Sequence, residues 1–281
     1  MPFFGRQREL WGAERVTGAR WGSACLFVGE SGAGKSALAQ EIARRNDTVA
    51  VVASPNERMW PYSGLSAVAA GLSGARRTAI DSVLARARDW PEHLLAEELS
   101  RTLQLVNDEP IVLVVDDLDE MDASSITVLS YVFGRLRGTG LSLIATVSAI
   151  DGRHAFAGLP HTVLDPLSFG ESVDLARALL GTTTARAVLH IIAAFTGGNP
   201  GVISRVRLTP EEAAGDTPLP LPLRLADDAA SRRRRVARPL PDPTTAALLD
   251  LLSVGPVFGV DRLRAEAVAA GIEMDDLIES G

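Results

Sequence analysis

The eight residues Gly-Glu-Ser-Gly-Ala-Gly-Lys-Ser at positions 29–36 constrain this chain more than any other stretch. They lie between the apolar run 24–28 and a helix-prone run that follows, where a strand is expected to turn into a helix. Glycines let successive backbone N–H groups point inward around phosphate oxygens, and the following helix directs its N-terminal dipole at the same anion. The stretch therefore predicts a phosphate-binding loop.

The pattern G-x-x-x-x-G-K-[ST] assigns a role to each specified position of this loop. We expect Lys35 to supply positive charge to the β- and γ-phosphates and the Ser36 hydroxyl to bind Mg²⁺. The predicted nucleotide-binding residues of the segment are Gly29, Glu30, Ser31, Gly32, Ala33, Gly34, Lys35, Ser36 and Ala37. The alternative is a glycine turn with an unrelated lysine, which leaves the strand before it and the helix after it unexplained.

A second apolar run, residues 111–115, ends in the two carboxylates Asp116 and Asp117. In parallel sheets covered by helices, ligands bind at the carboxyl ends of the strands. We expect Asp116 to hold Mg²⁺ through water and Asp117 to polarise an attacking water molecule. A helix or turn cap is the alternative role for Asp117. The two motifs together predict ATP or GTP binding, with Lys35, Asp116 and Asp117 as the catalytic residues.

Strand and helix patterns alternate through the first 165 residues. Buried parallel strands are expected at 24–28, 48–53, 111–115 and 141–147, and helices at 34–45, 65–72, 78–88, 92–106 and 123–136. This alternation implies right-handed crossovers and predicts an α/β fold, a parallel sheet with helices on both faces. Beyond Asp165 the strand pattern fades. Helices are expected there at 169–180 and 184–195, with the second ended by the turn 197–200.

Composition excludes several classes of function. A net charge of −7 argues against general nucleic-acid affinity. The single cysteine, Cys25, cannot form an internal disulfide, which favours a reducing, cytoplasmic location. Apolar runs are interrupted well before about 18 residues, and the N-terminus lacks the features of a signal peptide, so no membrane partner is expected. The four histidines are scattered, which argues against a zinc site.

Two further sequence patterns do not predict a functional site. Ala33 stands where the nucleophile elbow G-x-S-x-G requires glycine, so that motif is not matched. The basic run Arg232–Arg235 has no aromatic residues interleaved, and a solvated face is favoured over phosphate contacts.

Several segments resemble the signal-transduction ATPases with numerous domains (STAND). Residues 3–10 resemble their opening motif hhGRxxEL, and residues 116–122 resemble their DDLHWAD segment, with the last aspartate retained as Asp122. Residues 165–168 followed by 196–200 resemble their LxPLS…TGGNP signature. Leu208–Glu211 and the prolines that follow also resemble large actinobacterial LuxR-type (LAL, MalT-like) transcriptional regulators.

This resemblance implies an AAA+-like module in four parts: a P-loop nucleotide-binding domain over 1–165, a helical lid over 166–214, a Pro/Arg-rich linker over 215–242 and the start of a winged-helix domain over 243–281. The last part ends within a helical pattern, which predicts a truncated domain. The resemblance further implies that Phe4, Gly5 and Arg6 help to enclose the adenine and that Pro200 packs near the base and phosphates.

In the family resembled, ATP favours an open, self-associating state and ADP a closed one. The expected partners are therefore nucleotide together with a second copy or an inducer protein, and no direct DNA contact is expected for these residues. Where the family has a γ-phosphate-sensing arginine this chain has Ser148, and Asp119 and Met121 replace a histidine and a tryptophan. Loss of that cation predicts slow hydrolysis.

The predicted function is thus an ATP-dependent regulatory switch. Two alternatives stay open at this point. The first is an AAA+-type motor or loader acting on a macromolecule. The second is a small-molecule kinase, for which Arg153, Arg177 and Arg186 are scattered candidates for a basic lid.

Overall fold

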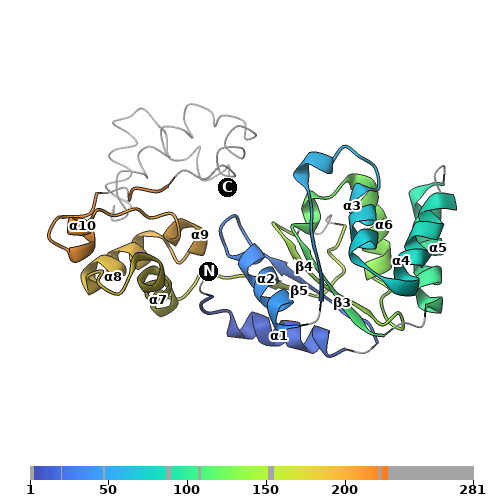
Figure 1. Cartoon of the computed structure of the whole chain (residues 1–281), viewed down its shortest axis with the longest axis horizontal. Coiled ribbons are helices and arrows are strands. Elements are labelled where there is room, and N and C mark those ends of the chain that lie inside the picture. Colours follow the sequence, from blue (N-terminus) through green and yellow to red (C-terminus); the bar gives the residue numbers. More distant parts are fainter. Residues whose placement is uncertain are drawn as a thin grey trace, which may run out of the picture. The chain divides into compact units, whose positions relative to one another are not determined.

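A computed structural model describes residues 3–19, 21–46, 48–86, 90–106, 109–150, 155–220 and 223–226. The chain divides into two compact units, one over Phe3–Pro166 and a second that begins at Leu167 (Figure 1). The expected winged-helix region 243–281, the basic run Arg232–Arg235 and Arg153 lie outside the described residues.

The first unit is built on a parallel sheet of five strands. These are β1 (Ala24–Val28), β2 (Thr48–Val52), β3 (Ile111–Asp116), β4 (Leu141–Val147) and β5 (His161–Val163). Their spatial order is β2-β3-β4-β1-β5, and every neighbouring pair is parallel. The predicted α/β fold with a parallel sheet is confirmed. The order places β4 between β1, which leads into the phosphate loop, and β3, which leads into the acidic segment.

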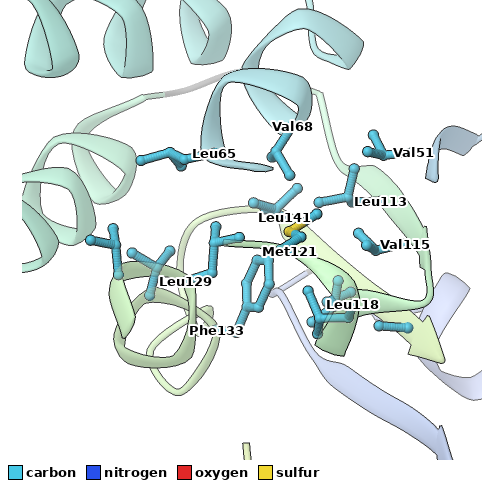
Figure 2. Close-up of a cluster of buried hydrophobic side chains, with 14 of the residues drawn as sticks. Val51, Leu65, Val68, Leu113, Val115, Leu118, Met121, Leu129, Phe133 and Leu141 are labelled. Carbon is cyan, nitrogen blue, oxygen red and sulfur yellow. The ribbon is translucent and has the colours of Figure 1, made fainter. Parts of the chain in front are cut away.

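Helices cover both faces of this sheet (Figure 1). On one face lie α1 (Gln7–Thr17) and α2 (Lys35–Arg45), and on the other lie α3 (Ser63–Gly71), α4 (Gly74–Arg86), α5 (Glu92–Leu105) and α6 (Ala123–Phe133). Successive residues of a strand point to opposite faces. Val112 and Val114 of β3 accordingly pack with α1 and α2, whereas Leu113 and Val115 pack with the other helices (Figure 2).

The larger core lies on the α3–α6 face. It joins strand residues to Leu65 and Val68 of α3 and to Leu129 and Phe133 of α6 (Figure 2). In α5 the buried leucines Leu95, Leu99 and Leu103 recur every four residues, as a helix with one buried face requires. Leu94, which the apolar pattern also included, is 45% exposed.

Three features of this unit differ from the sequence-based expectation. Strand β2 is at the edge of the sheet, and its last residue, Val52, is 68% exposed, so the expected burial of this strand is wrong. Helix α1 and strand β5 were not expected. Strand β5 has three exposed residues and is defined by its pairing with β1, in which Leu26 lies opposite His161.

The described part of the second unit is helical. It contains α7 (Phe169–Leu180), α8 (Arg186–Phe195), α9 (Pro200–Ile203) and α10 (Pro210–Ala214). Both predicted helices, 169–180 and 184–195, are present, the second beginning two residues later. The turn between α8 and α9 has Gly197 and Gly198 at positive φ, and the Asn199 side chain accepts a hydrogen bond from the Val202 N–H. Pro200 is the first residue of α9, a position to which proline is well suited. It therefore begins a new helix, in addition to lying after the end of α8.

Among the residues described, no helix is both long and apolar enough to cross a membrane.

Candidate nucleotide-binding site

The phosphate loop runs from the end of β1 at Val28 to the start of α2 at Lys35. Gly32 and Gly34 have φ angles of 83° and 94°, a region that residues with a Cβ rarely adopt. A Cβ at Gly29 would lie 3.1 Å from the Cβ of Ala33 and 3.2 Å from the Cβ of Leu164. Backbone conformation favours glycine at positions 32 and 34, and close packing favours it at position 29. The assignment of the loop to phosphate binding stays a prediction.

Lys35 lies inside this loop and is only 6% exposed. Its Nζ donates hydrogen bonds to the carbonyl oxygens of Gly29 at 2.7 Å and Glu30 at 3.3 Å. Gly34 at the N-cap has no side chain to cap the N–H groups of the first turn of α2, which include that of the exposed Ser36. A buried cation and a helix N-terminus therefore meet in one loop, which is the arrangement that binds phosphate.

The N-terminal motif contacts this loop directly. Arg6 is buried, and its guanidinium donates a hydrogen bond to the Ala33 carbonyl oxygen at 2.9 Å and pairs with the Glu9 carboxylate at 3.3 Å. Gly5 and Arg6 both have left-handed backbone conformations, at φ 67° and 64°. The structure thus brings Arg6 to the loop backbone. The role of Phe4, Gly5 and Arg6 around an adenine stays a prediction.

The carboxyl end of β3 presents Asp116, which is 8% exposed. Its Oδ1 accepts a hydrogen bond from the Thr146 hydroxyl of β4 at 2.6 Å, and the same hydroxyl oxygen accepts one from the Asp117 N–H at 2.8 Å. Thr146 therefore connects both carboxylate residues to the neighbouring strand. It was not predicted as a site residue, although a polar residue near the carboxyl end of a buried apolar strand was a usable signal.

Asp117 is half-buried and has a left-handed φ of 53°. Burial raises the pKa of its carboxyl, and the neighbouring charge of Asp116 raises it further, while the Lys35 ammonium opposes the shift. Lys35 and Asp117 are thus within electrostatic reach of each other. Asp117 stands at the N-cap of the 3-10 helix Leu118–Glu120, but its side chain makes no capping hydrogen bond. The alternative role as a cap therefore lacks the interaction that defines it, and a carboxylate of raised pKa is suited to accept a proton.

Ser148 directly follows β4, whose last residue Val147 is paired with Val28 at the start of the phosphate loop. The Ser148 N–H donates a hydrogen bond to Oδ2 of Asp119 at 2.8 Å. The structure therefore links Ser148 and Asp119, two of the three positions at which this sequence departs from the family pattern. Assignment of Ser148 to the sensor position stays a prediction.

Asp122, at the end of the acidic segment, has a different environment. It is 2% exposed and caps α6, where its carboxylate accepts a hydrogen bond from the Ser125 N–H. The same carboxylate accepts hydrogen bonds from three groups at the start of α3: the Tyr62 N–H, the Ser63 hydroxyl and the Gly64 N–H. Burial alone would raise the pKa of Asp122, but these donors lower it below its ordinary value. Asp122 therefore fastens two helices together.

The predicted Mg²⁺ ligands, Ser36 and Asp116, fit that ion by their chemistry. Mg²⁺ prefers oxygen ligands and usually takes one or two protein oxygens, with water and substrate phosphates completing its shell. Within the described residues no cluster of three or more His, Cys, Asp or Glu side chains could form an all-protein metal site. A hydroxyl and a carboxylate at the carboxyl edge of the sheet are consistent with a Mg²⁺ ion that has two protein oxygen ligands, with water and phosphates as the others.

A hollow of about 400 Å³ lies at the opposite edge, beside the amino ends of β2 and β3. The buried Arg76 lines it and donates hydrogen bonds to the carbonyl oxygens of Glu109 at 2.7 Å and Thr139 at 3.1 Å. Because this guanidinium holds the loops before β3 and β4, we assign it a structural role and place the candidate site at the carboxyl edge.

Comparison with known families agrees with this geometry. The profile of the family described as AAA ATPase domain matches residues 2–144, slightly more than half of the chain. The chain therefore belongs to the AAA ATPase domain family. It contains an AAA+ ATPase module, whose relatives bind nucleotide. A comparison with curated proteins finds no match.

Several solved structures align with this chain at low sequence identity. A Walker-type ATPase of Pyrococcus abyssi is 13% identical, with a TM-score of 0.46 over 72% of this chain and 66% of that one. A STAND protein with a tetratricopeptide-repeat sensor from Pyrococcus horikoshii is 15% identical, with a TM-score of 0.47 over 93% of this chain and 36% of that one. A RuvB variant of Thermotoga maritima is 18% identical, with a TM-score of 0.46 over 99% of this chain and 85% of that one.

Proposed function

We propose that this chain is the ATP-binding switch module of a LuxR-type transcriptional regulator, with slow hydrolysis and nucleotide-dependent self-association. The observation that carries the nucleotide part is that the loop holding the buried Lys35 follows β1 and that Asp116 ends β3. Both therefore lie at the carboxyl edge of the parallel sheet, with only β4 between the two strands. The regulatory part is supported by the sequence resemblance to STAND proteins and LAL regulators, which includes the opening motif at 3–10 and the turn at 196–200.

Each residue has a defined task in the proposed reaction. Lys35 and the N–H groups that begin α2 bind the phosphates, and Ser36 and Asp116 hold Mg²⁺, which when bound neutralises charge on the β- and γ-phosphate oxygens. Asp117 accepts a proton from water as the water oxygen bonds to the γ-phosphorus and the bond to the β-phosphate oxygen breaks. Thr146 holds Asp116 in position by donating its hydroxyl hydrogen.

Slow hydrolysis follows from the end of β4. A cation at this position would stabilise the charge that develops on the γ-phosphate, an effect worth about 10³-fold or more in related systems. Ser148 carries no charge, and its N–H is already bonded to Asp119. We therefore expect the module to stay in its ATP-bound state for a long time before hydrolysis, as a regulatory switch requires.

The test measures nucleotide binding and turnover on the same preparation. ATP and ADP should raise the melting temperature of the wild-type chain, and Lys35→Ala should abolish the shift. Arg44→Ala, which removes an exposed cation from the same helix, should leave it unchanged. Turnover should stay at or below about one per minute, and Ser148→Arg should raise it about tenfold or more.

The outcomes separate the candidate functions. No thermal shift in the wild-type protein would remove the nucleotide function altogether. Turnover well above one per minute would favour a motor or loader ATPase, and transfer of phosphate to a small acceptor would favour a kinase. An unchanged rate in Ser148→Arg would mean that the sensor position lies elsewhere. A nucleotide-independent mass in sedimentation would contradict the self-association part of the proposal.

A further inference from the structure

We infer that Arg6 is a positioning residue that holds the backbone of the phosphate loop in one conformation. Through that loop it strengthens binding of the phosphates rather than binding of the base. This inference rests on the proposed nucleotide-binding function. It assigns Arg6 a task different from the adenine contact that the family resemblance implies. The carrying observation is the hydrogen bond from its guanidinium to the Ala33 carbonyl oxygen at 2.9 Å.

The direction of one peptide unit explains why this bond affects the phosphate site. The Ala33 carbonyl and the Gly34 N–H belong to the same planar trans peptide, so they point in opposite directions. A guanidinium that holds the carbonyl oxygen on its own side turns the Gly34 N–H away from Arg6. The Ala33 N–H is bonded separately to the Glu30 carbonyl oxygen at 3.1 Å, which limits rotation of the neighbouring peptide. Arg6 thus selects the orientation of an N–H group in the loop.

The backbone around Arg6 is arranged to deliver this side chain. Gly5 and Arg6 are consecutive left-handed residues, and a residue with a Cβ is sterically strained in that region. Such strain persists only where surrounding contacts compensate for it, and it is often associated with function. The Arg6 carbonyl also accepts the Leu10 N–H at 2.9 Å, so the strained residue is fixed to the first turn of α1.

Helix α1 is in turn fixed to the elements on either side of the loop. Leu10, Ala13 and Val16 are buried in the same cluster as Phe27 of β1 and Leu38 of α2. Arg6 therefore projects from a helix that packs on both the strand before the loop and the helix after it. Its charge is paired with Glu9 at 3.3 Å, so the buried guanidinium carries no uncompensated charge. A charge-assisted bond from so rigid a support is well suited to fix a loop conformation.

The test compares the affinities of pyrophosphate and ADP, measured by calorimetry in the presence of Mg²⁺, in four versions of the protein. These are wild type, Arg6→Ala, Arg6→Lys and the control Arg15→Ala, which removes an exposed cation from the same helix. We expect Arg6→Ala to weaken both ligands about 10- to 100-fold and by the same factor, because a hydrogen bond from a charged group is lost. Arg6→Lys should restore part of the affinity for both ligands, and Arg15→Ala should match wild type.

Other outcomes would overturn the inference in identifiable ways. If Arg6→Ala weakens ADP but leaves pyrophosphate binding unchanged, Arg6 contacts the base and the positioning role is wrong. If both variants at Arg6 bind ADP as wild type does, the bond to Ala33 has no effect on the site. If Arg6→Ala does not fold, the Arg6→Lys protein decides by the same comparison. Failure of the wild-type protein to bind ADP would instead remove the proposed function itself.

Discussion

Asp117 and Asp122 belong to one short acidic segment, yet the pKa of the first is raised and that of the second is lowered. Burial raises the pKa in both cases. Around Asp117 the charges of Asp116, Asp119 and Glu120 add to that rise. Around Asp122 backbone and hydroxyl donors outweigh it. The difference shows that an aspartate becomes a candidate base where donors are few and like charges are near, and a structural anchor where donors converge.

The boundary between the two environments is the 3-10 helix Leu118–Glu120. Before it, the carboxylates lie at the edge of the sheet that also carries the phosphate loop. After it, Asp122 holds the start of α3 to the start of α6. Replacing a side chain on either side should therefore change a different property, and the following experiments test that separation.

The largest effect is expected for Asp117→Asn. ATP hydrolysis should fall about 10²- to 10³-fold because the proton acceptor is lost, whereas nucleotide binding and thermal stability should change little. The wild-type rate should decrease as the pH falls through the pKa of Asp117, which lies above the ordinary value of 3.8, because the protonated carboxyl cannot act as a base. The pH profile of the variant should lack this limb. A profile identical to that of wild type would assign the proton acceptor to another group.

The next effect is on stability. Asp122→Ala should lower the free energy of unfolding by about 2–4 kcal/mol, since it removes a helix cap and leaves buried N–H groups unpaired. Urea denaturation of the variant and of the exposed control Asp81→Ala provides the measurement.

The pH dependence of this difference has a defined sign. The pKa of Asp122 is depressed in the folded protein, so its contribution to stability is present above the ordinary value of 3.8 and is lost as the pH falls through the folded pKa. The difference in the free energy of unfolding between wild type and Asp122→Ala should therefore decrease as the pH is lowered below 3.8. A constant gap down to pH 2 would show that packing, rather than the carboxylate, holds the two helices.

The smallest effect is expected for Thr146→Val, which keeps the shape of the side chain and removes its hydroxyl. Asp116 loses a donor and the Asp117 N–H loses an acceptor, so hydrolysis should decrease about tenfold. The dependence of turnover on Mg²⁺ concentration should shift to higher concentrations. Thr127→Val, at an exposed position of α6, is the matched control. An unchanged Mg²⁺ dependence would separate Thr146 from the metal-binding carboxylate.

Much of the first unit was predictable because its signals are local. The glycine loop between a strand and a helix, and the apolar strand that ends in Asp116, each require only a few neighbouring residues. Strand β5 could not be found in this way, because its three exposed residues become a strand only through pairing with β1. The position of β2 at the edge was equally hidden, since a run of β-branched residues does not indicate how many neighbours a strand has.

In the candidate site, too, some features follow from the local sequence and others depend on tertiary contacts. Lys35, Ser36 and Asp116 follow from a motif, whereas the partner of Arg6 depends on how α1 packs. Helix α1 itself was recoverable, since Leu10, Ala13 and Val16 recur every three residues, but Gly12 and the β-branched end obscure the pattern. Capping of α6 by Asp122 was also recoverable from the aspartate before an apolar helical run. Its bonds to the start of α3 required the tertiary structure.

The position of β1 within the sheet has a consequence for how the protein is made. Its two neighbours are β4 and β5, which come last in sequence among the five strands of this sheet, so that Ala24 pairs with Leu143 and Val28 with Val163. During synthesis the phosphate loop is made before β4 and β5, and its strand gains no neighbours until more than a hundred further residues have followed. Pairing between such distant residues is slow, because the entropy of closing the long intervening chain is lost before the contacts begin to stabilise the sheet. The phosphate loop is therefore expected to become functional only after β4 and β5 have been synthesised and have paired with β1.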